Sequence, residues 1–222
     1  MKVLLFGATG MVGHGVLREC LRADDVTLVR TVGRSATGQR DPKLDEVVHA
    51  NLFDYHDIEA QLQGFDACFF CLGVSSAGMS EADYSHMSYD LTLAAAQTLA
   101  RLNPQMTFVY VSGAGTDSSE QGRTMWARVK GRVENALQRL PFKAVYLFRP
   151  GVIQPLHGAV SKTASYRVFY ALSKPLLPLL RMLLPGVILT TEGIGLAMLR
   201  VARSGAPKAV LEVRDIAELT HA

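Results

Sequence analysis

The chain has 222 residues, of which 49% are hydrophobic and 19% are charged, and its formal net charge is +3. This length predicts one domain with a substantial core. The small charge, without a cluster of Lys and Arg, argues against a nucleic-acid partner.

Apolar runs and apolar residues at helical spacing alternate along the chain. The short apolar runs predict strands at Val3–Phe6, Val26–Val32, Val47–Ala50, Ala67–Leu72, Met106–Val111, Ala144–Phe148 and Ala209–Val213. Helical spacing predicts helices at Met11–Arg22, Asp57–Gln63, Ala82–Leu102, Glu120–Leu140 and Thr191–Arg203. Because strands and helices alternate, we predict an α/β fold with a Rossmann-like, doubly wound parallel sheet.

Cysteine usage bears on both compartment and chemistry. Cys20, Cys68 and Cys71 cannot form a disulfide framework and are typical of a reducing compartment. The first apolar run, KVLLF, is too short for a secretory signal, so we expect a cytoplasmic protein. Cys68 and Cys71 match C-x-x-C, but on a strand this spacing places the two sulfurs on opposite faces. No histidine pair has metal-ligand spacing, so we predict no metal site.

The pattern changes after Pro150. We expect a single domain, 1–222, in which residues 1–154 form a cofactor-binding core and residues 155–222 form a small C-terminal substrate-side segment. Prolines 155, 175, 178 and 185 interrupt the apolar stretch that opens this segment.

Three cations, Arg167, Lys174 and Arg181, recur every seven residues and would form one stripe on a helix. A peripheral membrane contact through 166–189, or a lid over an apolar substrate, would explain this stripe. The prolines within the stretch favour instead a packed segment with solvated cations.

The stretch FGATGMVGHG places Gly7, Gly10 and Gly13 between the first predicted strand and the first predicted helix. This is the pattern of a dinucleotide-binding turn, in which glycines allow a sharp turn, backbone approach to a pyrophosphate and close helix packing. A tight turn without a ligand is the structural alternative. We expect the whole turn to bind the cofactor, including Thr9, Met11 and Val12.

The end of the second strand indicates the cofactor. Arg34 lies 21 residues after Gly13, where NAD-binding proteins carry an acidic residue that contacts the ribose 2′-hydroxyl. A guanidinium there suits the 2′-phosphate of NADP, with Ser35 as a second donor. The alternative is a solvated surface arginine; we expect NADP rather than NAD.

Two further strand ends should line the same cofactor. Asn51 and Leu52 follow the third strand, where adenine is expected. Cys71, Leu72 and Gly73 end the fourth strand beside the expected ribose path, because ligands of open α/β sheets bind at the carboxyl edge.

From Met1 to about Gln154 the chain resembles the atypical short-chain dehydrogenase/reductase superfamily, whose members include epimerase-like proteins. The motifs that carry the resemblance are the glycine turn, CLG, VYVSGAG, VKGRVE and RPGVI. It implies that Ser112 polarises a carbonyl, that Lys130 binds ribose hydroxyls, and that Pro150, Gly151, Val152 and Ile153 line the nicotinamide.

The family's proton donor is a tyrosine four residues before the lysine, and here that position is Trp126. An indole has an N–H donor but no accessible acid–base equilibrium. We therefore treat Trp126 as a substrate contact and consider Lys130 as the proton carrier. Tyr84 and Tyr89 are further candidates, although packing explains them equally well.

These patterns predict an NADP(H)-binding oxidoreductase or epimerase-like enzyme with a small carbonyl or hydroxyl substrate. The competing hypothesis is a non-catalytic NADP(H)-binding sensor or scaffold that has lost the proton donor. Trp126 favours the second hypothesis, whereas Ser112 and Lys130 favour the first.

Overall fold

Seven parallel strands form the central sheet in the computed structural model, which describes residues 1–159 and 188–221. The strand order is β3-β2-β1-β4-β5-β6-β9, and every neighbouring pair is parallel. Its first six members follow the order of a dinucleotide-binding sheet. The strands are β1 (Lys2–Phe6), β2 (Leu28–Gly33), β3 (Leu44–Val48), β4 (Ala67–Phe70), β5 (Thr107–Val111), β6 (Ala144–Phe148) and β9 (Val210–Leu211).

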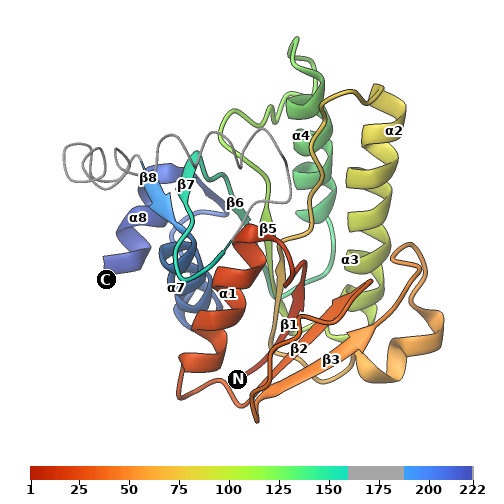
Figure 1. The fold of residues 1–222 in the computed structure, drawn as a ribbon. Helices are drawn as coiled ribbons and strands as arrows, with labels where there is room; N and C mark the ends of the chain where they lie inside the picture. The colour runs from red at the N-terminus through yellow and green to blue at the C-terminus, as the bar shows by residue number, and fades with distance from the viewer. Residues whose placement is uncertain (160–187, 222) are drawn as a thin grey trace.

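Helices cover both faces of the sheet (Figure 1). α1 and α7 pack together on one face, and α2, α3 and α4 cover the other. The helices are α1 (Met11–Arg22), α2 (Glu81–Ser85), α3 (Leu91–Leu102), α4 (Met125–Leu137), α7 (Thr191–Ser204) and α8 (Val213–His221). β7 (Val152–Gln154) and β8 (Ile188–Thr190) form a separate parallel pair. The predicted Rossmann-like α/β fold is confirmed.

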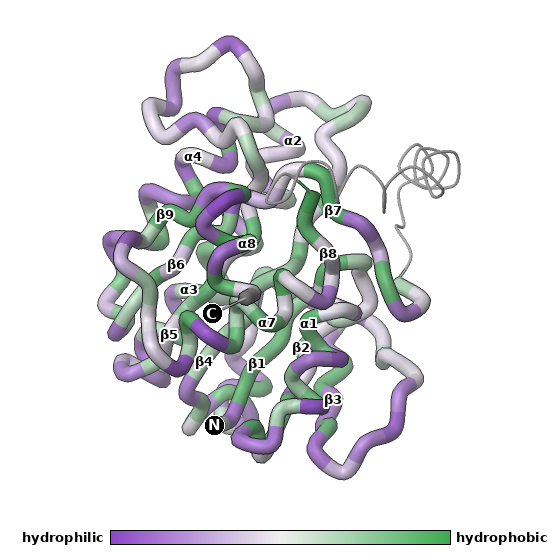
Figure 2. Tube along the Cα trace, turned by 90° about the vertical axis from the view of Figure 1, so that its left-hand side faces the viewer, coloured by the Kyte–Doolittle hydropathy of each residue, from purple (hydrophilic) through white to green (hydrophobic). Residues whose placement is uncertain are grey.

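The central strands are buried on both faces, which explains their nearly continuous apolar runs. In β1, Leu4 and Phe6 enter the core beneath α3 and α4, whereas Val3 and Leu5 enter the core beneath α1 and α7. Figure 2 shows the hydrophobic strands in the middle of the molecule and the most hydrophilic segments on its periphery. The two cores hold the carboxyl ends of the strands at one edge of the sheet.

Several predicted boundaries are wrong because local hydrogen bonds override the apolar pattern. The helix predicted over Glu120–Leu140 begins only at Met125. Before it, the Asp117 carboxylate accepts hydrogen bonds from the N–H groups of Ser119 and Gly122, and Glu120 has φ +63°. A right-handed helix does not accommodate that conformation.

Three other elements differ from their predictions in their bounds or in their type of helix. β3 begins at Leu44 rather than Val47, since Leu44 pairs with Val29 of β2. The helix predicted over Asp57–Gln63 is a 3₁₀-helix, His56–Gln61. The long helix predicted over Ala82–Leu102 contains a π-helical turn, His86–Asp90, between α2 and α3.

The C-terminal part departs furthest from the prediction. The strand predicted over Ala209–Val213 is only Val210–Leu211, and Val213 begins the unpredicted helix α8. β7 and β8 were too short to be recognised as apolar runs. The cation stripe of Arg167, Lys174 and Arg181 lies outside the described residues. Among the residues described, no helix is long and apolar enough to cross a membrane.

Candidate cofactor and catalytic site

Gly7 and Gly13 bring the start of α1 directly against the end of β1. Gly7 has φ +82°, and a Cβ there would lie 2.7 Å from the carbonyl carbon of Cys71. A Cβ on Gly13 would lie 2.1 Å from the Gly7 carbonyl oxygen. Both positions therefore require glycine, which is the close strand–helix packing expected of a phosphate-binding turn.

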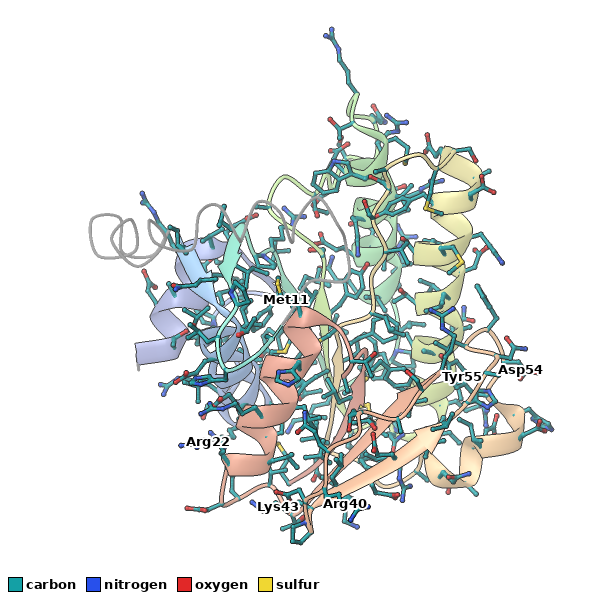
Figure 3. All side chains as sticks on the ribbon, viewed as in Figure 1. Met11, Arg22, Arg40, Lys43, Asp54 and Tyr55 are labelled. Carbon is teal, nitrogen blue, oxygen red and sulfur yellow. The ribbon has the colours of Figure 1, made fainter. Side chains whose placement is uncertain are left out.

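The first turn of α1 is chemically suited to an anion. Gly10 is its N-cap, and no acidic residue lies in the first turn. The N–H groups of Met11 and Val12 have no carbonyl acceptor in a preceding helical turn, and the helix dipole adds positive potential there. In Figure 3, Met11 lies at this end of α1 and Arg22 at the opposite end.

A pocket opens at the carboxyl edge of the sheet, beside the glycine turn. Among the described residues that line it, Arg34 is the only charged side chain, and it is exposed. The lining residues come from the ends of β1, β2 and β4 and from the segment after β3: Gly7, Ala8, Thr9, Gly10, Thr31, Val32, Gly33, Arg34, Ser35, Thr37, Leu52, Cys71, Leu72 and Gly73. This set contains many of the predicted cofactor residues.

The remaining predicted cofactor residues lie outside the pocket lining. Met11, Val12 and Gly13 belong to the adjoining first turn of α1. Asn51 is exposed, and its side-chain oxygen accepts a hydrogen bond from the N–H of Phe53. The stretch Pro150–Ile153 lies against the loop that follows β5, where the Pro150 carbonyl accepts from the N–H of Ala114.

Within that stretch, the Ile153 side chain is buried in the core beneath α1 and α7. Val152 is 40% exposed. A Cβ on Gly151 would lie 3.3 Å from the Val213 side chain, which ties this stretch to the start of α8.

Lys130 is buried beside the pocket. A Cβ on Gly73, a lining residue, would lie 4.0 Å from the Lys130 Nζ. The Nζ donates a 2.8 Å hydrogen bond to the Tyr110 hydroxyl and lies 4.8 Å from the centre of that ring. Burial lowers the pKa of Lys130 to about 8, and the nearby Glu134 carboxylate opposes the shift. Lys130 therefore exchanges its proton near neutral pH more readily than a surface lysine does.

Ser112 belongs to a buried polar network that the sequence did not predict. Its hydroxyl donates to the Glu134 Oε1 at 2.6 Å, and the Phe148 carbonyl oxygen lies 3.1 Å from the same Oγ. Both neighbours are acceptors, and a hydroxyl has one proton. In this arrangement Ser112 has no proton left for a substrate carbonyl, so the role implied by the family requires the Glu134 bond to open.

Arg149 neutralises the Glu134 carboxylate, which is fully buried. Its Nε donates to Glu134 Oε1 at 3.1 Å, and its Nη2 bonds Glu134 Oε2. The same guanidinium reaches Ser118 and Glu212, so it connects α4 with the loop after β5 and the start of α8. A buried carboxylate needs such a partner to remain charged.

Trp126 is half-buried and packs on the loop after β5. Cβ atoms on Gly113 and Gly115 would lie 3.9 Å and 3.7 Å from its six-membered ring. It belongs to neither hydrophobic core. Trp126 therefore packs over the loop after β5 and is not a core residue.

Five polar residues of this region were not predicted from the sequence: Tyr110, Ser118, Glu134, Arg149 and Glu212. Tyr110 lies two residues before Ser112, which directly follows β5, so the alternation of extended backbone directs both side chains to the same side of the sheet. Glu134 lies one helical turn after Lys130, on the same face of α4. These two spacings were visible in the sequence, but pairing them requires the strand and helix to be placed side by side.

Cys68, Cys71, Tyr84 and Tyr89 are all packed in, or against, the hydrophobic interior. Cys68 is buried beneath α3 and α4, whereas Cys71 packs against the core beneath α1 and α7. Cys71 directly follows β4, and the two sulfurs lie toward opposite faces of the sheet, as predicted. Burial raises the pKa of both thiols. Tyr84 is buried, and burial raises its pKa, while Tyr89 packs at the edge of the core beneath α3.

Comparison with protein families gives one match that spans most of the chain. A family model described as NAD(P)H-binding matches residues 7–144. This range contains the glycine turn, the pocket lining and both Ser112 and Lys130.

Two relatives match this chain with similar sequence identity. Protein FMP52-2 of Scheffersomyces stipitis is 26% identical over 67% of this chain and 65% of its own length. Protein HTATIP2 of Rattus norvegicus is 27% identical over 68% of this chain and 62% of its own length. The chain thus spans less than two thirds of the length of these relatives.

Among solved structures, the Bordetella bronchiseptica enzyme WbmF in complex with NAD+ has a TM-score of 0.70 and 16% identity. The match covers 99% of this chain and 76% of WbmF. At this identity the likeness establishes the fold.

The names of the fungal relatives contradict the expected cytoplasmic location, so that prediction is wrong. FMP52-2 and other fungal relatives are named as mitochondrial proteins. The expectation failed because unpaired cysteines report the redox state of a compartment and do not identify it.

Proposed function

The chain belongs to the NAD(P)H-binding family, and from this premise we propose that it is an NADP(H)-dependent oxidoreductase or epimerase-like enzyme of the atypical short-chain dehydrogenase/reductase type that its motifs resemble. Its substrate would be a small carbonyl or hydroxyl compound. The observation that carries the proposal is the pocket, in which Arg34 is the only charged side chain among the described lining residues.

The residues at the pocket fit the parts of a dinucleotide. The first turn of α1 would hold the pyrophosphate through its N–H groups. Arg34 and Ser35 would hold a 2′-phosphate by charge-assisted hydrogen bonds. Cys71, Leu72 and Gly73 would border the ribose next to Lys130. A bound nicotinamide supplies or accepts the hydride, and the proton must come from this chain or from water.

Lys130 is the proton carrier that the geometry favours. Its ammonium group is desolvated, lies next to the pocket wall and has a pKa of about 8. A general acid works best when its pKa is near the operating pH. Trp126 would contact the substrate from the first turn of α4. Ser112 would orient the substrate once its hydroxyl leaves Glu134.

A thermal-shift screen tests the proposed cofactor. NADPH should raise the melting temperature more than NADH at equal concentration, because a ligand that binds the native state stabilises it by mass action. No shift with either nucleotide would contradict the proposal. A panel of small aldehydes, ketones and secondary alcohols, added with cofactor, then tests for turnover.

A non-catalytic sensor or scaffold is the second candidate function. Two observations favour it: Trp126 stands where the superfamily has its phenol, and the Ser112 hydroxyl donates its hydrogen bond to Glu134. This candidate predicts tight NADPH binding with no oxidation of NADPH under single-turnover conditions by any compound of the panel.

A further inference from the structure

The turn that carries Arg34 is hydrogen-bonded to the sheet through Glu46, a residue that does not line the pocket. Glu46 lies on β3, directly beside Thr31 of β2 in the strand register. Its Oε2 accepts a 2.7 Å hydrogen bond from the Thr37 N–H and a 3.3 Å hydrogen bond from the Thr31 hydroxyl. Glu46 is half-buried and does not belong to the pocket lining.

The two groups that Glu46 holds flank the predicted 2′-phosphate contacts. Thr31 precedes Arg34 and Ser35, and Thr37 follows them; all four line the pocket. One carboxylate oxygen therefore joins Thr37, in the connection between β2 and β3, to the Thr31 side chain on β2. The Thr37 hydroxyl accepts from the N–H of Gln39, so its own proton remains available to a ligand.

Loop residues such as Arg34 and Ser35 are exposed and lose conformational entropy when they close on an anion. A turn whose Thr37 N–H is already hydrogen-bonded to β3 loses less, which is the usual benefit of preorganisation. Glu46 would then contribute to phosphate recognition although it carries the same sign of charge as the phosphate.

On the basis of the proposed function, we propose that Glu46 is the positioning residue that sets the preference for a 2′-phosphorylated cofactor. It does so by holding Thr31 and Thr37 so that Arg34, Ser35 and the Thr37 hydroxyl face one phosphate. The opposing possibility is that Glu46 acts only as a like charge that weakens phosphate binding.

Two variants separate position from charge. Glu46→Gln keeps the side-chain length and an acceptor oxygen but removes the charge. Glu46→Asp keeps the charge but withdraws the carboxylate by one methylene. Asp45→Asn is the matched control, because Asp45 directly precedes Glu46 in β3 and pairs with Arg30 rather than with the turn.

Calorimetry with NADPH and NADH measures the ratio of their dissociation constants for each variant. We expect Glu46→Asp to reduce the preference for NADPH by about tenfold, the scale of a lost hydrogen bond to a charged group. Glu46→Gln and Asp45→Asn should keep the wild-type ratio within about twofold, and NADH affinity should be unchanged throughout.

The inference is overturned if Glu46→Asp keeps the wild-type ratio, or if Glu46→Gln tightens NADPH several-fold, since the charge alone would then matter. Equal affinity of the wild type for both nucleotides would also overturn it, together with the role of Arg34. Failure of the wild type to bind either nucleotide would instead contradict the proposed function. Melting temperatures on the same preparations confirm that each variant is folded.

Discussion

The Lys130 Nζ donates a 2.8 Å hydrogen bond to the Tyr110 hydroxyl, and both groups are buried. A lysine and a tyrosine are thus paired in this protein, although no tyrosine stands four residues before the lysine. Tyr110 is completely buried, and burial raises its pKa well above the ordinary value. Lys130 is consequently the member of the pair that titrates near neutral pH.

Lys130→Met should stabilise the fold at pH 7. The pKa of Lys130 falls from 10.5 to about 8 on folding, so the unfolded chain binds more protons between those two pH values. Below about pH 8 Lys130 is protonated in both the folded and the unfolded chain, so burial of its charge destabilises the folded state by a constant amount. This destabilisation declines as the pH rises from about 8 to about 10.5. The gain at pH 7 should be at most about 3 kcal/mol. Urea unfolding at pH 7 and pH 10 measures it.

The exposed Lys143 supplies the control for this prediction. Lys143→Met should change the free energy of unfolding by less than about 0.5 kcal/mol at either pH. A stability gain of Lys130→Met that is the same at pH 7 and pH 10 would show that packing, rather than deprotonation, is responsible.

The same Lys130→Met variant should bind NADPH more weakly, by about 1.5–3 kcal/mol, which is typical of a hydrogen bond to a charged group. Stability and affinity would then change in opposite directions, as expected where a strained polar site serves function. Calorimetry provides the affinity. Wild-type affinity in Lys130→Met would remove this lysine from the cofactor site.

Arg34→Asp should invert the cofactor preference from NADPH to NADH. The substitution would remove the proposed charge-assisted contact to the 2′-phosphate and add repulsion, while a carboxylate can accept from the 2′-hydroxyl of NADH. Arg40→Asp is the matched control: Arg40 is exposed in the same connection between β2 and β3 but lies outside the pocket lining. In the view of Figure 3, Arg40 and Lys43 both lie toward the Arg22 end of α1, away from Met11. If the two variants behave alike, general surface charge explains the preference.

Glu134→Gln should destabilise the protein by about 3–5 kcal/mol, because it leaves the Arg149 guanidinium without its buried counter-charge. Glu212→Gln removes the other carboxylate partner of Arg149, but that side chain is 48% exposed. It should cost less than about 1 kcal/mol. Denaturant unfolding of both variants makes the comparison. Similar, small effects would mean that water enters the network and solvates Arg149.

The sequence predicted the sheet, and the pocket lies at the edge where a cofactor was expected, because both depend on local patterns. Buried parallel strands leave uninterrupted apolar runs, and Gly7 and Gly13 are imposed by the contacts of a single strand–helix junction. Arg34 was identified by its distance from that junction alone. The strand order could be anticipated from the alternation of elements, since doubly wound sheets have few arrangements.

The polar network could not be predicted because it joins distant segments. Glu134 meets Arg149 only when α4 packs across β5 and β6, and Glu212 reaches Arg149 only through β9. No spacing in the sequence encodes those contacts. The hydrogen-bond direction at Ser112 was likewise invisible, since it depends on which acceptors the fold brings to a hydroxyl.

Trp126 decides between the two candidate functions, and its position allows a direct test. Trp126→Tyr places a phenol four residues before Lys130, and Trp126→Phe keeps an aromatic ring over the Gly113–Gly115 loop without any N–H donor. Because Trp126 is outside both cores, each variant should keep the wild-type melting temperature within a few degrees, about 1 kcal/mol or less.

If the site is catalytic and lacks only an efficient proton donor, Trp126→Tyr should accelerate NADPH-dependent reduction of a test carbonyl such as 4-nitrobenzaldehyde. General acid catalysis contributes about 10²–10⁴-fold, so a gain of at least about tenfold should be visible even with imperfect geometry. Trp126→Phe should change the rate only through substrate fit, and its pH profile should keep the limb near pH 8 that Lys130 imposes. Single-turnover NADPH oxidation measures both variants. Loss of all turnover in Trp126→Phe, with unchanged melting and NADPH affinity, would show instead that the indole N–H itself participates in the reaction.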